Sequence, residues 1–282
     1  MGNLLKHEVN IMLCPYCRTE VKDGVRFCPE CGATLNYAAV QKEQGERIAM
    51  ATEGGMMLGA AARKARLSAV VSEDLLIGTR AYNGVIMGVL LWGLLVNVLL
   101  CFTVGSVYRY ISPGLFLVLY IALAIGGIVL AGKSQKPLIS FLGYNMVVVP
   151  FGLVISTLVD AYGGPYTDLV TDAFFYTMLI SLGMTGAALA FPNLFAKLGG
   201  ALLGVLTGLV LCELVLLLLG RYQAVTDWIA AGLFSLYIGY DLYRSQQFPK
   251  TVDNAVDCAL DIYLDIANLF IRILSILAKK RD

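Results

Sequence analysis

Two aspartates interrupt an apolar stretch, CALDIYLDIANLFIRIL, at residues 258–274. The polar residues of its central part are spaced i, i+4, i+7 and i+11, and they are Asp261, Asp265, Asn268 and Arg272. On a helix this spacing puts all four on one face. An ionised aspartate at the centre of a bilayer costs about 2.5–3.5 kcal/mol on insertion scales. The stripe must therefore face the interior of a helix bundle or a hydrated cavity rather than lipid.

A second buried acid is expected in the preceding apolar segment, AAGLFSLYIGYDLYRSQQ, where Asp241 stands near the end. A short loop joins the two segments, which predicts antiparallel neighbours with Asp241 and Asp265 at similar depth. Two carboxylates that meet in a low dielectric cannot both stay ionised, so they share a proton. The protonated pair would hold the two helices together, and the deprotonated pair would repel or attract a cation.

Hard carboxylate oxygens suit Ca²⁺ or Mg²⁺. A stable calcium site takes about 6–8 oxygens, and Asp241, Asp265, Asn268 and some carbonyls do not reach that number. They predict a weak transit site, as conduction requires. Two further acids lie in apolar segments: Asp172 is either at an outer mouth or at a helix N-cap, and Glu213 is either a pathway acid or a protonated residue that joins helices.

The elements that must position these residues are membrane helices. The chain has 282 residues, 58% of them hydrophobic and only 15% charged, whereas a soluble protein has about 25% charged residues. Several apolar runs approach the ~20 residues of a spanning helix. Seven spans are predicted, at residues 83–103, 113–131, 138–159, 169–190, 196–219, 226–243 and 256–277. The sequence thus predicts an all-α polytopic membrane protein, with a seven-helix transmembrane domain at residues 81–282.

The distribution of basic residues favours a cytoplasmic N-terminus, because short inside loops carry more Lys and Arg. With that orientation Lys133, Lys136, Lys197, Arg244 and Lys250 lie inside. The tail at residues 279–281 disagrees, since seven full spans would place it outside. The last segment therefore either crosses against this bias or re-enters the membrane. No secretory signal peptide is expected. The net charge of +1 gives no indication about nucleic acid, and no nucleic-acid partner is predicted. A bacterial plasma membrane is favoured over endoplasmic reticulum.

A separate cysteine module is predicted at residues 1–38, followed by a partly helical linker at 39–80. Its cysteines form the pattern C-x2-C-x10-C-x2-C and are Cys14, Cys17, Cys28 and Cys31. Four thiolates suit tetrahedral structural Zn²⁺, which leaves no open position for catalysis. Such a short module needs metal to fold. Two disulfides are the alternative, but a cytoplasmic location is reducing and disfavours them.

The last two segments resemble the transmembrane Bax inhibitor motif family. FSLYIGYDLY at 234–243 is similar to the sixth helix of that family, and IYLDIANLFIRIL at 262–274 is similar to its seventh. TDAFFYT at 171–177 resembles part of the fourth helix. The resemblance covers roughly residues 80–278, and the ribbon looks like a separate fusion.

This resemblance implies a seven-helix bundle with the last helix central. It also implies that Asp241 and Asp265 form a di-aspartyl pH sensor that gates a calcium leak. Bacterial members can hold the sixth-helix aspartate with an arginine of the second helix, and this chain has Lys133 and Lys136 near that place. Asp261 adds a negative charge one turn from the sensor.

Two other functions compete with a non-enzymatic leak across the lipid bilayer. An intramembrane aspartyl protease would use the same two acids, but its second aspartate needs a GxGD context and here the context is IYLD. The single histidine, His7, lies outside the predicted spans, which excludes a Ser-His pair and HExxH. The other alternative is a non-conducting scaffold that recruits a protein partner through the zinc ribbon.

Overall fold

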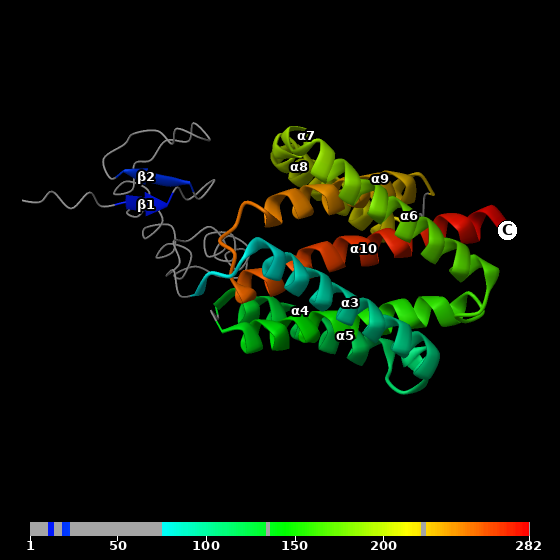
Figure 1. The fold of residues 1–282 in the computed structure, drawn as a ribbon. Helices are drawn as coiled ribbons and strands as arrows, with labels where there is room; N and C mark the ends of the chain where they lie inside the picture. The colour runs from blue at the N-terminus through cyan, green and yellow to red at the C-terminus, as the bar shows by residue number, and fades with distance from the viewer. Residues whose placement is uncertain (1–10, 14–18, 23–74, 134–135, 221–223, 282) are drawn as a thin grey trace, which may run out of the picture. The chain divides into compact units, whose positions relative to one another are not determined.

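The computed structural model describes residues 11–13, 19–22, 75–133, 136–220 and 224–281 (Figure 1). The chain forms two compact units, Met1–Asp74 and Leu75–Asp282. In the first unit, strands β1 (Ile11–Leu13) and β2 (Glu20–Lys22) pair antiparallel, with Met12 opposite Val21. The four predicted zinc ligands and most of the predicted linker lie outside the described residues.

Helices build the described part of the second unit, which confirms the predicted seven-helix bundle. The long helices are α3 (Thr79–Thr103), α4 (Pro113–Lys133), α5 (Pro137–Ala161), α6 (Asp168–Ala190), α8 (Gly199–Leu218), α9 (Ala224–Ser245) and α10 (Val252–Arg281). A 3₁₀ turn, η2 (Val107–Arg109), follows α3, and the short helix α7 (Pro192–Ala196) precedes α8. Three helices begin with proline, whose fixed φ and missing N–H suit the first helical position.

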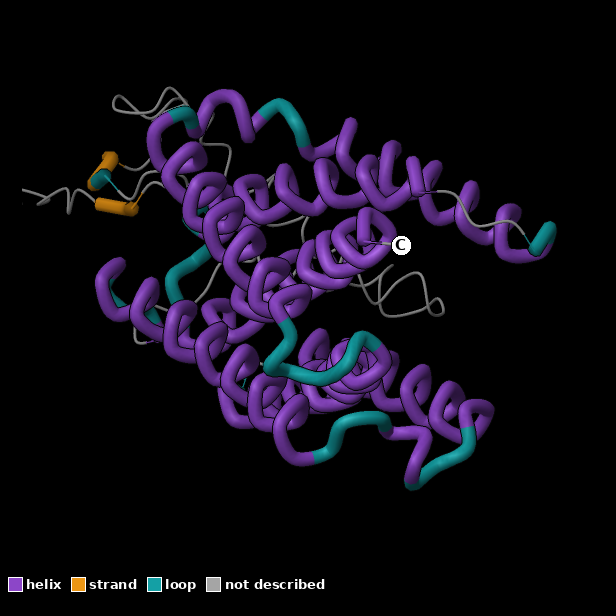
Figure 2. The backbone as a smooth tube through the Cα atoms, turned by 90° about the vertical axis from the view of Figure 1, so that its right-hand side faces the viewer, coloured by secondary structure: helices purple, strands orange, loops and turns teal. Residues whose placement is uncertain are grey.

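The last helix occupies the centre of the bundle. Helix α10 packs against α3, α5, α6 and α9, and Figure 1 shows it between the α3–α5 group and the α6–α9 group. Figure 2, seen from the end at which α10 stops, shows the C-terminal end between these two groups. The side chains of Ala255, Ala259, Tyr263 and Leu269 are completely buried. This burial on every side confirms the central position predicted from the family resemblance.

Five of the helices are long and apolar enough to cross a membrane: α3, α4, α5, α6 and α8. Their outward faces expose large apolar side chains, among them Leu91, Leu117, Val118, Leu182 and Leu203, as lipid-facing helices do. Helices α9 and α10 do not meet the same criterion, because each carries several charged residues. Helix α10 is nevertheless continuous over 30 residues, or about 45 Å.

Close backbone contact and buried polar groups fix the helices around α10. A Cβ at Gly127 of α4 would lie 2.6 Å from the carbonyl oxygen of Gly143 of α5, so these helices approach at a distance that only glycine permits. Asn97 of α3 donates a 2.8 Å hydrogen bond to the Tyr263 hydroxyl of α10. The Tyr82 hydroxyl donates to the Ser245 carbonyl at 3.0 Å. The Asn97–Tyr263 hydrogen bond helps to fix the rotation of α10 and hence the direction of its polar face, and the other two contacts hold the surrounding helices.

Candidate functional site: a charged face on the central helix

The loop between α9 and α10 sets the register of the two helices. Thr251 caps α10, because its hydroxyl accepts a hydrogen bond from the backbone N–H of Asn254 at 3.1 Å. The Asn254 side chain donates to the Pro249 carbonyl at 2.9 Å, which closes the loop. The two helices leave this loop as neighbours with extensive contact. Asp241, about one turn before the end of α9, therefore reaches the face of α10 that carries Asp265.

Asp265 of α10 is buried near other acids. It is 7% exposed, and the charge of Asp241 on the neighbouring helix α9 acts on it. The Oδ2 atom of Asp265 is buried without a hydrogen-bond partner among the described residues. Asp261, one turn earlier, adds a like charge that also acts on Asp265.

The basic group nearest to this pair comes from α9 itself. An Arg244 Nη1 atom lies 3.3 Å from Asp241 Oδ1, at a spacing of i, i+3. This contact is long for a charge-assisted hydrogen bond. Arg244 of the same helix thus supplies a positive charge to Asp241.

Packing against the α7 segment positions Asp241 along the bundle. The Phe195 ring of α7 is 1% exposed and lies directly against Gly239, where an added Cβ would collide with the ring. On the neighbouring residue, the Tyr240 ring fills the space over Gly199 at the start of α8. Glycine at position 239 thus permits the close approach that holds this turn of α9 in place.

The acidic face of α10 begins two turns earlier than the predicted stripe. Asp253 and Asp257 precede Asp261 and Asp265 at the same four-residue spacing, and both are buried. The Ser140 hydroxyl of α5 donates a 2.5 Å hydrogen bond to Asp253 Oδ1. Sequence reasoning missed both acids: Asp253 precedes the predicted span, which started at residue 256, and Asp257 stands in its first turn and was not singled out. The i, i+4 repeat of aspartate would have revealed them.

The opposite half of the same face is basic. Arg272, Ser275 and Lys279 all contact Asp227 of α9, which is 1% exposed. Arg272 also forms an ion pair with Glu213 of α8 at 2.7 Å. Glu213 thus joins α8 to α10 as an ion-pair partner. Asp227 was not singled out from the sequence, because it stands at the start of a span where an acid usually serves the helix N-terminus.

The other predicted site residues lie apart from these contacts. Asn268 donates its amide to the Leu264 carbonyl of its own helix at 2.8 Å. Asp172 is exposed on α6, and the N-cap of that helix is Thr167. Within the described ranges, no group of three or more His, Cys, Asp or Glu side chains is arranged to hold a metal ion.

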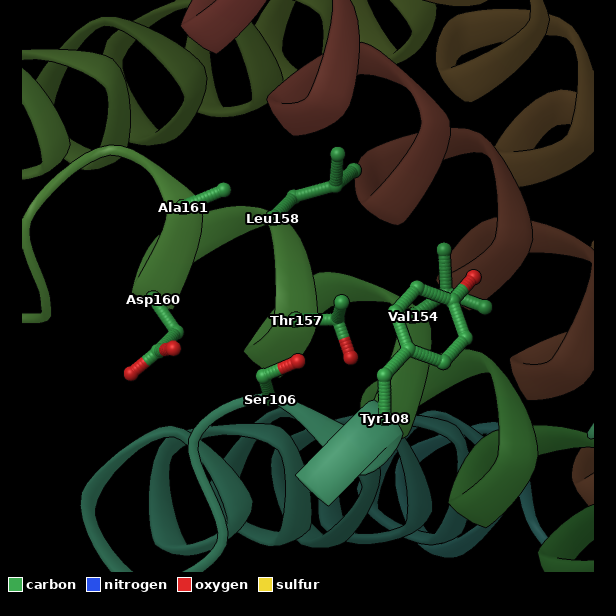
Figure 3. A pocket seen from close by; sticks show the side chains of 7 residues that line it. All are labelled: Ser106, Tyr108, Val154, Thr157, Leu158, Asp160 and Ala161. Carbon is green, nitrogen blue, oxygen red and sulfur yellow. The ribbon is translucent and has the colours of Figure 1, made fainter. Parts of the chain in front are cut away.

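A cavity of about 390 Å³ lies at another place, between η2 and the end of α5 (Figure 3). It is lined by Ser106, Tyr108, Val154, Thr157, Leu158, Asp160 and Ala161. The Arg109 guanidinium binds both carboxylate oxygens of Asp160 at 2.7 Å and fixes the loop to α5. None of the acids on α10, and neither Asp227 nor Glu213, lines this cavity, so it is separate from the charged face of α10.

Comparison with known proteins decides the family. Residues 74–282 match the family model described as "Inhibitor of apoptosis-promoting Bax1", and residues 13–35 match a zinc-ribbon domain. The chain belongs to the Bax inhibitor family. It is a multi-pass membrane protein of that family with a zinc-ribbon domain ahead of the helices, as the sequence resemblance predicted.

Three relatives illustrate the range of this Bax inhibitor family. An uncharacterised protein of Helicobacter pylori is 32% identical over 176 residues, which cover 61% of this chain and 65% of the relative. Protein lifeguard 4 of Mus musculus is 30% identical over 44% of this chain and 50% of the relative. Bax inhibitor 1 of Saccharomyces cerevisiae is 39% identical over 22% of this chain and 20% of the relative. The matches therefore cover less than two thirds of these relatives.

Proposed function

We propose that this Bax inhibitor family protein is a pH-sensitive leak for Ca²⁺, gated by the Asp241–Asp265 pair. The observation that supports the proposal is the burial of Asp265 on α10, where the charge of Asp241 from the neighbouring helix α9 acts on it. The proposed activity is passive flux and not catalysis. The N-terminal unit lies on the cytoplasmic side in this proposal, as the basic loops favour.

The shared proton acts as the switch in this mechanism. With one proton, the pair forms an O–H···O⁻ hydrogen bond that holds α9 against α10. When that proton leaves, two negative charges face each other. At a separation of about 4 Å and an effective dielectric constant of about 20, their repulsion is roughly 4 kcal/mol. Asp261 adds to this repulsion, and Arg244 offsets part of it.

Calcium is the proposed cargo because the face that lines the path offers hard oxygen ligands. Asp241, Asp261 and Asp265 supply carboxylates, whereas a tight calcium site needs about 6–8 oxygens. A cation that meets only part of this set binds weakly and leaves quickly, which favours conduction over storage. The absence of a closed acidic cluster among the described side chains fits this requirement.

The test is Ca²⁺ flux into liposomes that contain the purified full-length protein, measured over a range of pH. Wild type should show flux that changes with pH, and Asp241→Asn and Asp265→Asn should each flatten that dependence. Asp168→Asn is the matched control, because Asp168 is an exposed aspartate in the first turn of α6. If both pair variants titrate like wild type, the sensor assignment is wrong.

The zinc-ribbon domain is proposed to hold one structural Zn²⁺ through the four cysteines Cys14, Cys17, Cys28 and Cys31. Their chemistry fits tetrahedral zinc. The first pair lies in the segment between the two paired strands, β1 and β2, a position that short ribbons use for a metal-binding turn. When bound, the metal supplies folding free energy to a unit too small for its own core. A protein partner for this domain is an additional proposed role.

A further inference from the structure

The basic half of the α10 face connects three helices through one set of ion pairs. Arg272 donates to Asp227 Oδ1 at 2.9 Å and to Glu213 Oε2 at 2.8 Å. Ser275 and Lys279 donate to Asp227 Oδ2 at 2.9 and 2.8 Å. Within this cluster two carboxylates face two basic side chains, so its formal charge is zero.

The cluster lies on the same face of α10 as the proposed gate. Arg272 follows Asp265 by seven residues, which is two turns or about 10 Å along the axis. Asn268 stands between them on that face. A cation that moves along the face from Asp265 toward the far end of α10 therefore meets the Arg272 guanidinium. A fixed positive charge in a narrow path is a barrier to cations.

Glu213 is placed to lower this barrier. Its carboxylate pairs with Arg272 through two nitrogen–oxygen contacts of 2.7 and 2.8 Å. Arg272 and Glu213 are each partly exposed, and Asp227 is buried behind them. A cation that reaches this part of α10 therefore meets the sum of the charges of Arg272 and Glu213. Asp227 contributes less, because Lys279 and Ser275 also bind its carboxylate.

We propose that Arg272 and Glu213 form a second constriction of the cation path, whose charge balance sets the rate of flux and the preference for divalent ions independently of pH. This inference rests on the proposed leak function and adds selectivity-determining residues to it. Arg272 limits cation entry, and Glu213 offsets that limit without forming a metal site. The acid pair is the proposed proton sensor, while this constriction acts through the ion pair between Arg272 and Glu213.

A purely structural ion pair and a charge-balanced constriction predict different directions of change in flux for the two single variants. If the pair only holds helices together, Glu213→Gln and Arg272→Gln both loosen the bundle and change flux in the same direction. If charge balance matters, Glu213→Gln adds a net positive charge and lowers flux, whereas Arg272→Gln removes one and raises flux. The double variant is neutral, as the wild-type pair is, and should recover wild-type behaviour.

The experiment measures Ca²⁺ and K⁺ flux in liposomes for wild type, the two single variants and the double variant. Glu213→Gln should lower Ca²⁺ flux about tenfold or more, and Arg272→Gln should raise it about threefold or more. Ca²⁺ should respond more strongly than K⁺, because its charge is double. Arg272→Lys keeps the positive charge and should change flux less than Arg272→Gln, and Lys280→Gln is the control for an exposed positive charge on α10. The pH midpoint should not move in any of them.

Two results would overturn the inference. One is a change of the same sign in both single variants with no recovery in the double variant; the other is an equal effect on Ca²⁺ and K⁺. Thermal melting in detergent identifies any variant that fails to fold. If a Glu213 variant fails, the flux of Arg272→Lys, which keeps the positive charge, is compared with that of Arg272→Gln, which removes it. If wild type carries no Ca²⁺, or Asp265→Asn leaves the titration unchanged, the proposed function itself has failed.

Discussion

Replacing Asp265 by asparagine tests the shared proton most directly. The new side chain would keep the size of the old one and offer Asp241 an amide N–H at every pH. In wild type, loss of the last proton replaces a hydrogen bond by repulsion of about 4 kcal/mol at an effective dielectric constant of about 20. Because 1.4 kcal/mol is a factor of ten, this corresponds to a change of up to about a thousandfold in the equilibrium between packed and separated helices.

The expected direction of the pH effect on α10 follows from the loss of the shared proton as pH rises. The contact between α9 and α10 is strongest while one proton is shared and weakens as pH rises and that proton leaves. Hydrogen–deuterium exchange of the first turns of α10, corrected for intrinsic exchange, should therefore increase with pH in wild type. In Asp265→Asn it should stay constant, because a neutral amide has no proton to lose. Asp168→Asn should behave like wild type.

One outcome would refute the reasoning. If the exchange of α10 in Asp265→Asn rises with pH as steeply as in wild type, then some other group loosens the helix. The same result in the double variant Asp241→Asn/Asp265→Asn would remove the pair from the mechanism altogether. Flux measured on the same samples would show whether the movement and the leak are linked.

Three other changes test separate parts of the structure. Gly239→Ala should push against the Phe195 ring and lower the free energy of unfolding by about 1–3 kcal/mol, visible as a lower melting temperature; an unchanged melting temperature would contradict the close packing. Ser140→Ala removes the hydroxyl donor of buried Asp253 and should cost about 1–3 kcal/mol; Ser140→Thr, which keeps the hydroxyl, is the control. Cys14→Ser should abolish bound zinc, measured by elemental analysis, and leave Ca²⁺ flux intact; lost flux would make the ribbon part of the gate.

Much of the bundle could be predicted because bilayer thickness fixes helix length. Uninterrupted apolar runs separated by Gly, Pro and charged residues gave all seven long helices within a few residues at most ends. The proposed pairing of Asp241 with Asp265 rests on a similar argument, since a short loop and helical spacing restrict which faces of α9 and α10 can meet. These arguments need only local geometry and the sequence distance between neighbouring helices.

The charge cluster could not be predicted in the same way. Glu213 and Arg272 are 59 residues apart, and nothing in the spacing of α8 indicates that its one acid turns toward α10. That rotation depends on packing across the bundle, including the contact of Phe195 with Gly239. The role of Asp227 could not be predicted either. An acid in the first turn of a helix is already explained by its favourable interaction with the helix N-terminus, so nothing indicated a distant ion-pair partner.

The central position of α10 has a consequence for biosynthesis. Chains emerge from the ribosome N-terminal end first, so the most deeply enclosed of the seven helices is also the last of them to be translated. Helix α10 is too polar to enter lipid readily by itself, and six membrane segments are already made when it arrives. The packing of α3, α5, α6 and α9 seen in the structure can therefore form only after the seventh helix has been made.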